Sequence, residues 1–341
     1  MVSSILYSLS SILFKRIEVT IAFVFPGQGA QHVGMGHDLY DASVAARAVF
    51  DQADATLGFP ITRLCFEGPE ASLTATENAQ PALLTTSTAL LATLAEGRGD
   101  RRQEMKDLSS LVSPLLSPVS FVAGHSLGEY SALVAAGALD FATALRLVRR
   151  RGELMAAANQ GAMAAIIGLG EALLEAICGE ASAPGAPVVI ANYNSPGQLV
   201  ISGASEAVER ACELAKARGA KRALHLKVSA AFHSPLMRAA AQELAGAIAE
   251  SAVTDARVPV IANVTAAPVS AADAIRGELV AQVTAPVRWI TSVQRMAADG
   301  VDMFVEIGPG SVLTGLIKRI ALSARLINVG DVASLQTFLS Q

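Results

Sequence analysis

Short apolar runs alternate with longer stretches of helical periodicity along most of the chain. Apolar runs fill Ile21–Phe25 and Val119–Ala123, and each is followed by a glycine-rich turn. Apolar residues recur at helical spacing over Asp41–Leu57, Pro81–Leu94 and 128–148. Continuous apolar runs of this length are typical of strands buried on both faces, and strands that alternate with helices form parallel sheets. The pattern therefore predicts an α/β fold with a mostly parallel sheet.

The same alternation resumes in the last third of the chain. Strands are expected at Val258–Asn263 and Met303–Ile307, and helices at Ala272–Val283, at Ser292–Gly300 and up to Ile320. Residues of the two ends should therefore contribute strands to one sheet.

Residues 161–228 follow a different order of elements, which is strand, helix, strand, strand, helix, strand. The expected elements are Ala162–Gly168, Glu171–Gly179, Val188–Asn192, Gln198–Ser202, Ser205–Arg218 with Ser205 as N-cap, and Arg222–Val228. This order is that of the ferredoxin-like motif. We expect a small ferredoxin-like subdomain over 161–228, inserted into a large domain formed by 21–160 and 229–341.

Composition excludes several classes of protein. Of 341 residues, 52% are hydrophobic and 16% are charged, as in a globular chain with a substantial core. A net charge of −4 without a dense Lys/Arg cluster argues against nucleic-acid binding. Three scattered cysteines, Cys65, Cys178 and Cys212, suit a reducing cytoplasm and have no metal-binding spacing. Glu129 and Asp140 interrupt the long apolar segment, so we expect no membrane span.

Two segments fall outside this scheme. Residues 1–20 are apolar and serine-rich, with Lys15 and Arg16 after the apolar run rather than before it, the reverse of a secretory signal. We expect a disordered or dispensable extension there, with a short amphipathic surface helix as the alternative. Residues 96–118 are rich in Ser and Pro and are expected to form an exposed loop.

The stretch Gly124-His125-Ser126-Leu127-Gly128 joins a predicted strand to a predicted helix. Strand, G-x-S-x-G and helix is the layout of a nucleophile elbow, whose sharp turn exposes the serine hydroxyl. The N–H of Leu127 would lie at a helix N-terminus, where it can donate to a developing oxyanion. A plain glycine turn is the alternative. We predict that Ser126 is a catalytic nucleophile.

A nucleophilic serine needs a base, and the chain has five histidines. His233 follows the inserted unit, in a loop that returns to the large domain, so it is the best placed to reach Ser126. A polar loop histidine without catalytic function is the alternative. No acid between the two residues lies at an obvious strand end, and a backbone carbonyl would then orient the base.

Three consecutive arginines, 149–151, end the helical segment after the elbow. They either form a solvated basic helix end, or one of them points inward. An inward guanidinium would select acyl groups that carry a free carboxylate, because it binds carboxylates in a bidentate manner. The spacing leaves both readings open.

The loop Pro26–Gln31 also follows a strand, which suggests a nucleotide site. His32 occupies the position of the third glycine of G-x-G-x-x-G, and no Gly-Lys-Ser/Thr follows. The loop is better suited to bring backbone donors near an anionic group.

Six motifs in order resemble the acyltransferase family of fatty-acid and polyketide synthesis, whose members include malonyl-CoA:acyl-carrier-protein transacylases. They are Phe25–Gln31, Gly124–Tyr130, Arg151–Met155, Asn192–Gly197, Phe232–Pro235 and Glu306–Leu313. The resemblance covers the chain from about Ile21 onward. It implies an α/β-hydrolase-like large domain with a ferredoxin-like insert, in agreement with the pattern above.

The resemblance also implies the role of each site residue. Ser126 carries the malonyl ester, His233 is its general base and acid, and Arg151 holds the malonyl carboxylate. The backbone N–H groups of Gln28 and Leu127 form the oxyanion hole, and the carbonyl of Gln282 orients His233. The acyl pocket is expected to be lined by Met155, Asn192 and Phe232.

The expected reaction moves a malonyl group from malonyl-CoA to an acyl carrier protein in the cytoplasm, with no metal and no cofactor. Phe232 resembles the bulky residue of malonyl-selective members, although packing against one methyl discriminates by only about 1–3 kcal/mol. A carrier protein is expected to be acidic, so Lys221, Arg222, Lys318 and Arg319 are candidates for a basic rim or are ordinary solvated charges. The alternatives are a discrete polyketide-synthase acyltransferase with malonyl or related acyl specificity, a serine thioesterase or hydrolase, and an inactive subunit that docks the carrier protein.

Overall fold

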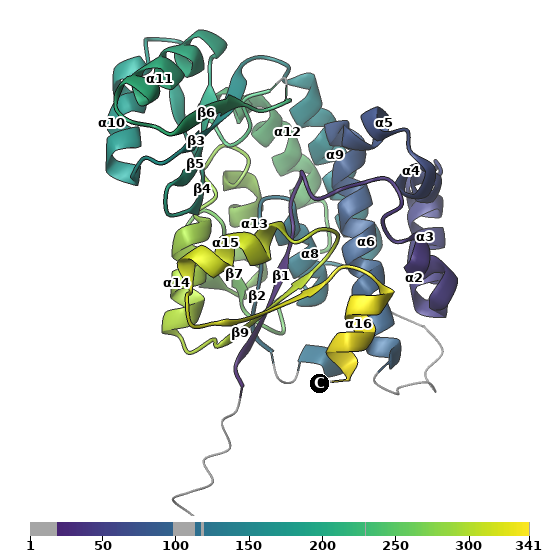
Figure 1. Ribbon diagram of the computed structural model, residues 1–341. Coiled ribbons are helices and arrows are strands. Elements are labelled where there is room, and N and C mark those ends of the chain that lie inside the picture. Colours follow the sequence, from purple (N-terminus) through teal and green to yellow (C-terminus); the bar gives the residue numbers. More distant parts are fainter. Residues whose placement is uncertain (1–18, 98–112, 117–118, 229, 341) are drawn as a thin grey trace, which may run out of the picture.

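A computed structural model describes residues 19–97, 113–116, 119–228 and 230–340 (Figure 1). The expectations for residues 1–20 and 96–118 lie almost wholly outside these ranges. Two sheets organise the described chain. One has six strands in the order β10-β9-β1-β2-β7-β8, and the other has four in the order β4-β5-β3-β6.

The six-stranded sheet is largely parallel, as the sequence pattern predicts. Only β8 runs antiparallel to its neighbour, β7. The strands are β1 (Ile21–Phe25), β2 (Val119–Gly124), β7 (Val260–Ile261), β8 (Pro268–Val269), β9 (Met303–Ile307) and β10 (Arg325–Val329). The first two come before the four-stranded sheet in the chain, and the other four come after it.

Side chains of β1 alternate between two hydrophobic cores. Phe23 and Phe25 belong to the larger core, whereas Ala22 and Val24 belong to a smaller one on the opposite face. Successive strand residues point to opposite faces, so a continuous apolar run means that both faces are covered. Figure 1 shows this arrangement, with helices in front of the sheet and behind it.

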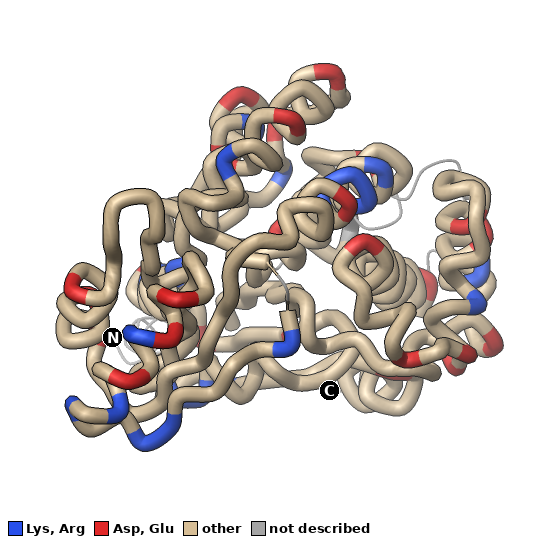
Figure 2. Tube along the Cα trace, turned by 90° about the horizontal axis from the view of Figure 1, so that it is seen from above, with Lys and Arg blue, Asp and Glu red and all other residues tan. Residues whose placement is uncertain are grey.

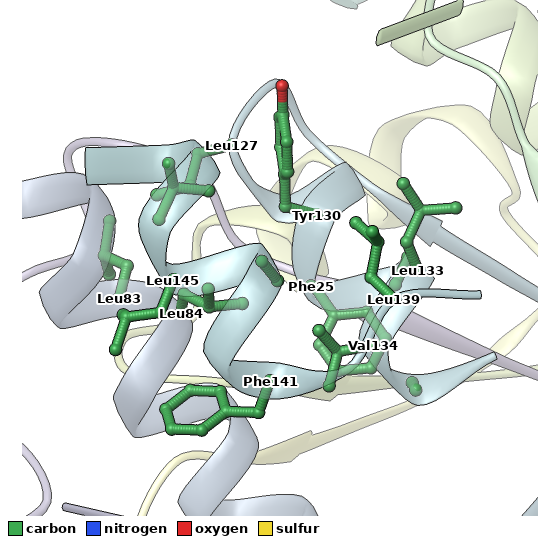
Figure 3. Packing of buried hydrophobic residues seen from close by; sticks show 14 of the residues in the cluster. Phe25, Leu83, Leu84, Leu127, Tyr130, Leu133, Val134, Leu139, Phe141 and Leu145 are labelled. Atoms are coloured by element: carbon green, nitrogen blue, oxygen red, sulfur yellow. The ribbon is translucent and has the colours of Figure 1, made fainter. Parts of the chain in front are cut away.

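Helices from the N-terminal half cover the larger core. They are α2 (His37–Ala42), α3 (Val44–Leu57), α4 (Ile61–Glu67), α5 (Glu70–Thr74), α6 (Thr76–Gly97), α8 (Gly128–Ala135) and α9 (Phe141–Ala157). Two helices from the C-terminal half, α12 (Arg238–Ala249) and α13 (Ala272–Ala281), add to it. Figure 3 shows Phe25 among leucines of α6, α8 and α9. A second group of helices, α14 (Trp289–Ala298) and α15 (Val312–Ile320), buries Trp289 and Leu313 on the opposite face, and α16 (Val332–Leu339) ends the described chain.

The four-stranded sheet is antiparallel throughout and has its own core. Its elements are β3 (Ala162–Ile167), α10 (Glu171–Ala181), β4 (Val188–Ser195), β5 (Gln198–Gly203), α11 (Ser205–Ala217) and β6 (Arg222–His225). Their order along the chain is the one expected for 161–228. A short parallel bridge between Asn192 and Val287 joins this sheet to the rest of the molecule.

Several predicted boundaries differ from the structure. The long helix after Ser126 is two helices, because Gly137 adopts a left-handed conformation (φ 71°) and Asp140 caps the new helix α9. Ser205 is the first helical residue rather than the N-cap, which is Ala204. The predicted strand Val258–Asn263 shrinks to two residues. The pattern did not yield α12, β10 or α16.

No helix in the described ranges is long and apolar enough to span a membrane. Those ranges also contain no group of three or more His, Cys, Asp or Glu side chains suited to hold a metal ion.

Glu306 closes the N-terminus of α15. Its buried carboxylate accepts hydrogen bonds from the N–H groups of Leu313 (3.0 Å) and Thr314 (2.7 Å). The N-cap residue Ser311 makes no capping bond of its own. A side chain seven residues upstream thus satisfies the first turn of this helix.

We expect Glu306→Ala to lower the free energy of unfolding by about 1–3 kcal/mol, because buried N–H donors lose their acceptor. Glu306→Gln keeps an acceptor oxygen and should lose less. Urea unfolding of both variants measures this difference. An alanine variant as stable as the parent protein would contradict the capping role.

Candidate active site

Ser126 lies on a strained turn between β2 and α8. Its φ of 52° is in the left-handed region, which a serine adopts only where the surroundings enforce it. A Cβ atom on Gly124 would lie 1.9 Å from the carbonyl carbon of Gly128, and one on Gly128 would lie 2.1 Å from the carbonyl oxygen of Phe25. The predicted strand–turn–helix layout is present, and both flanking glycines are required by close backbone contacts.

Asn263, which the sequence patterns did not single out, holds this turn in place. Its Oδ1 accepts a hydrogen bond from the N–H of Ser126 (2.7 Å), and its Nδ2 donates to the carbonyl of Gly124 (2.7 Å). The residue follows β7, the strand next to β2 in the sheet. Because carboxyl ends of parallel strands meet at one edge, a residue 137 positions away can brace the serine.

His233 meets Ser126 as the sequence predicts. Its Nε2 lies 2.8 Å from the serine Oγ. Its Nδ1 lies 2.8 Å from the carbonyl oxygen of Gln282 and 3.1 Å from that of Ala285. Carbonyls only accept hydrogen bonds, so Nδ1 carries the proton and Nε2 is free to accept the serine proton. The predicted backbone acceptor at Gln282 is therefore present, with a second one beside it.

Burial, and then the positive charge of Arg151, together lower the pKa of His233 to about 3, although the hydrogen bonds to the two carbonyls act in the opposite direction. The side chain is only 3% exposed. The imidazole is therefore neutral near pH 7, which is the form that can act as a base.

The three arginines have different surroundings. Arg149 pairs with Glu153, and Arg150 pairs with Glu243. Arg151 is 1% exposed, and its guanidinium donates to Oε1 of Gln80 (2.8 Å), to Oε1 of Gln282 (2.9 Å) and to Oγ of Ser126 (3.1 Å). The question that the sequence left open is answered in geometry, because Arg151 points inward, to the serine.

Gln282 links the parts of this cluster. Its side-chain Nε2 donates to the backbone carbonyl of Ser126 (3.0 Å) and to the carboxyl of Glu129. Burial and the nearby Glu278 raise the pKa of Glu129 well above its usual range. Neither Glu129 nor the side chain of Gln282 was identified from the sequence, although Glu129 adjoins the Gly-His-Ser-Leu-Gly stretch.

Other predicted site residues surround the cluster. Gln28 sits in the loop after β1, which touches the serine turn, since a Cβ atom on Gly27 would lie 2.3 Å from the carbonyl oxygen of His125. Met155 is buried near Arg151, because its Sδ accepts a hydrogen bond from Gln80 (3.7 Å). Three more predicted residues, Leu127, Asn192 and Phe232, are buried. Leu127 and Phe232 adjoin Ser126 and His233 in the chain, and Asn192 bridges to Val287.

The four candidates for a basic rim lie on two elements. Arg222 is the first residue of β6 and Lys221 immediately precedes it, whereas Lys318 and Arg319 are in the last turn of α15. Figure 2 shows Lys and Arg interspersed with Asp and Glu in this view, without one dense basic patch. The rim stays a prediction.

We expect the imidazole of His233 to stay neutral as the pH falls below about 6.5, the ordinary histidine pKa. In this range the unfolded chain binds a proton at His233 and the folded chain does not, so this residue lowers the stability of the fold as the pH falls. Arg151→Gln removes a neighbouring positive charge and should raise the pKa of His233, although burial persists. Nitrogen-15 NMR titration of the imidazole measures the pKa of His233 in the parent protein and in the variant. An unchanged pKa in the variant would contradict the electrostatic coupling.

Residues 22–335 match the acyl transferase domain family. The malonyl CoA-acyl carrier protein transacylase of Bacillus subtilis (strain 168) is 46% identical over 319 residues, covering 93% of this chain and 95% of that protein. Its counterpart in Escherichia coli (strain K12) is also 46% identical, over 90% of this chain and 95% of that protein.

Solved structures resemble the fold at similar identity. An acyl-carrier-protein-S-malonyltransferase from Bartonella henselae superposes with a TM-score of 0.87 at 43% identity, covering 94% of this chain and 99% of that one. A malonyl-transacylase in complex with its type II PKS acyl-carrier protein gives a TM-score of 0.86 at 44% identity, again over 94% and 99% of the two chains.

Proposed function

The chain belongs to the acyl transferase family, and we propose that it transfers a malonyl group from malonyl-CoA to the phosphopantetheine thiol of an acyl carrier protein. The observation that carries the proposal is the position of Arg151. A buried guanidinium 3.1 Å from the Oγ of Ser126 suits an acyl group that carries its own carboxylate.

The first half-reaction acylates the serine. Nε2 of His233 accepts the proton of the Ser126 hydroxyl, and Oγ attacks the thioester carbonyl carbon. The N–H groups of Gln28 and Leu127 stabilise the resulting oxyanion, and Arg151 holds the malonyl carboxylate during attack. When the carbon–sulfur bond breaks, CoA leaves as a thiol with the proton from His233.

The second half-reaction reverses these steps with a new thiol. The carrier-protein thiol gives its proton to His233 and attacks the ester carbonyl, and Ser126 leaves with that proton. Both half-reactions use one site, so the kinetics are ping-pong.

We propose that no resident cofactor takes part, since CoA enters and leaves with the substrate. A cytoplasmic location suits the three cysteines, Cys65, Cys178 and Cys212, all of which are free and buried. Hydrolysis is the nearest alternative, and it differs only in having water as the acceptor. A malonyl-enzyme that persists without carrier protein would argue against hydrolysis.

For the architecture, we propose an α/β-hydrolase-like large domain over 21–160 and 229–341 with a ferredoxin-like insert over 161–228. Two features support this division. The strand order β4-β5-β3-β6 with two helices is that of a ferredoxin-like sheet, and each part has its own hydrophobic core.

Incubation with malonyl-CoA should add the mass of one malonyl group to the protein, and the adduct should disappear when a carrier protein with a free phosphopantetheine thiol is added. Ser126→Ala removes the nucleophile and should give no adduct. Intact-mass spectrometry detects both results. A malonyl adduct on Ser126→Ala would contradict the assignment.

Arg151→Ala should lower the preference for malonyl-CoA over acetyl-CoA by roughly 10- to 100-fold, because a charged hydrogen bond to the acyl carboxylate is lost. Arg150→Ala is the matched control, since Arg150 pairs with Glu243 at the surface. The ratio of kcat/KM for the two thioesters measures the effect. A parent-like ratio in Arg151→Ala would contradict the role.

A further inference from the structure

We propose that Gln80 determines acyl specificity by holding the guanidinium of Arg151 through a neutral oxygen, which leaves its positive charge for the acyl carboxylate. The inference rests on the function proposed above and concerns a residue on α6 whose hydrogen bonds in the described structure go to Arg151 and Met155 rather than to Ser126 or His233. Gln80 is therefore a positioning residue.

All acceptors of Arg151 in the described structure are uncharged. They are the amide oxygens of Gln80 and Gln282 and the hydroxyl of Ser126. The side-chain amide of Gln282 lies between Arg151 and the acid Glu129, because its Oε1 accepts from Arg151 and its Nε2 donates to Glu129 and to the backbone carbonyl of Ser126. Within the part of the chain that the structure describes, no carboxylate therefore accepts a hydrogen bond from the buried guanidinium.

The two preceding arginines show the opposite arrangement. Arg149 has Glu153 at 2.7 Å, and Arg150 has Glu243 at 2.8 Å. The three successive arginines therefore differ in whether a carboxylate of the protein pairs with them, and a site that binds a substrate carboxylate needs an arginine that is not so paired. The two outward arginines are neutralised by carboxylates, and the inward one is not. A buried charge without a partner is costly, so an incoming carboxylate gains an interaction that a neutral acyl group cannot make.

Neighbouring side chains fix the direction of both amides. Nε2 of Gln80 faces the Sδ of Met155 at 3.7 Å, and a thioether can only accept. The oxygen of Gln80 must then face Arg151. In Gln282 the nitrogen is used by Ser126 and Glu129, so its oxygen also faces the guanidinium. The orientation of the acceptors follows from their surroundings and does not depend on the arginine alone.

Close packing of α6 and α9 brings Gln80 to this position. A Cβ atom on Gly152 would lie 2.7 Å from the Cα of Glu77, so the two helices touch beside Arg151. Gln80, one turn further along α6, is completely buried against α9. An amide here has no access to water, and its oxygen accepts a hydrogen bond from Arg151.

The test is Gln80→Glu, which keeps the shape and adds a countercharge. We expect the ratio of kcat/KM for malonyl-CoA over acetyl-CoA to fall by roughly 10- to 100-fold, because the introduced carboxylate pairs with Arg151 in place of the malonyl carboxylate. The ratio should recover as the pH is lowered and the introduced carboxyl takes up a proton, whereas the parent protein should show no such recovery. A parent-like ratio at every pH would overturn the inference.

Asn78→Asp is the matched control. Asn78 lies two residues earlier on α6, and its Oδ1 accepts from Arg149 at 2.7 Å, so the variant adds the same charge beside the neighbouring arginine. Its ratio should equal that of the parent, and a fall equal to that of Gln80→Glu would overturn the inference by showing a non-specific charge effect.

Gln80→Leu serves if the charged variant does not fold. Loss of the acceptor should raise KM for malonyl-CoA relative to KM for acetyl-CoA, because only the malonyl group has a carboxylate that contacts the held guanidinium. An unchanged KM would overturn the inference. If the parent protein acquires no malonyl group, the proposed function itself fails, and that result is obtained before any variant is made.

Discussion

The close backbone contact between Gly128 and the carbonyl of Phe25 is the constraint on which the site depends. It brings the start of α8 against the end of β1, which forces the turn at Ser126 into a left-handed conformation and raises the hydroxyl above the sheet. Asn263 then braces the turn from the next strand. With the hydroxyl fixed in this way, one imidazole and one guanidinium can both lie within hydrogen-bonding distance of it.

Both cationic or protonatable partners of the serine are held by neutral oxygens. His233 is oriented by two backbone carbonyls, where hydrolases commonly use a carboxylate, and Arg151 is held by two amides and a hydroxyl. An ionised acid next to His233 would lie close to Arg151 as well, and it would compete with an acyl carboxylate for the guanidinium. Backbone carbonyls orient the base and amides hold the arginine, so no protein carboxylate is needed for either. The positive charge of Arg151 is therefore left to pair with the carboxylate of the substrate.

Sequence patterns predicted those features that depend on residues close together along the chain. The apolar runs gave the strands of the parallel sheet, and the spacing around Ser126 gave its turn, because both are local. The inward direction of Arg151 was left open, since it depends on how α9 packs against α6 at Gly152. Asn263, Gln80 and Glu129 were missed for the same reason, as each acts on residues of other elements. The break at Gly137 was missed because apolar periodicity continues through it.

The bridge between the two sheets also limits how the molecule can move. Val287 exchanges hydrogen bonds with β4 on both sides, accepting from the N–H of Tyr193 (2.9 Å) and donating to the carbonyl of Ala191 (2.8 Å). Two residues earlier, Ala285 supplies a carbonyl to His233. A rotation of the four-stranded sheet that broke this ladder would also displace the imidazole. A hinge motion that keeps His233 in place must therefore have its axis along the contact between Val287 and β4. The largest displacement would then be at β6, on the opposite edge of the four-stranded sheet.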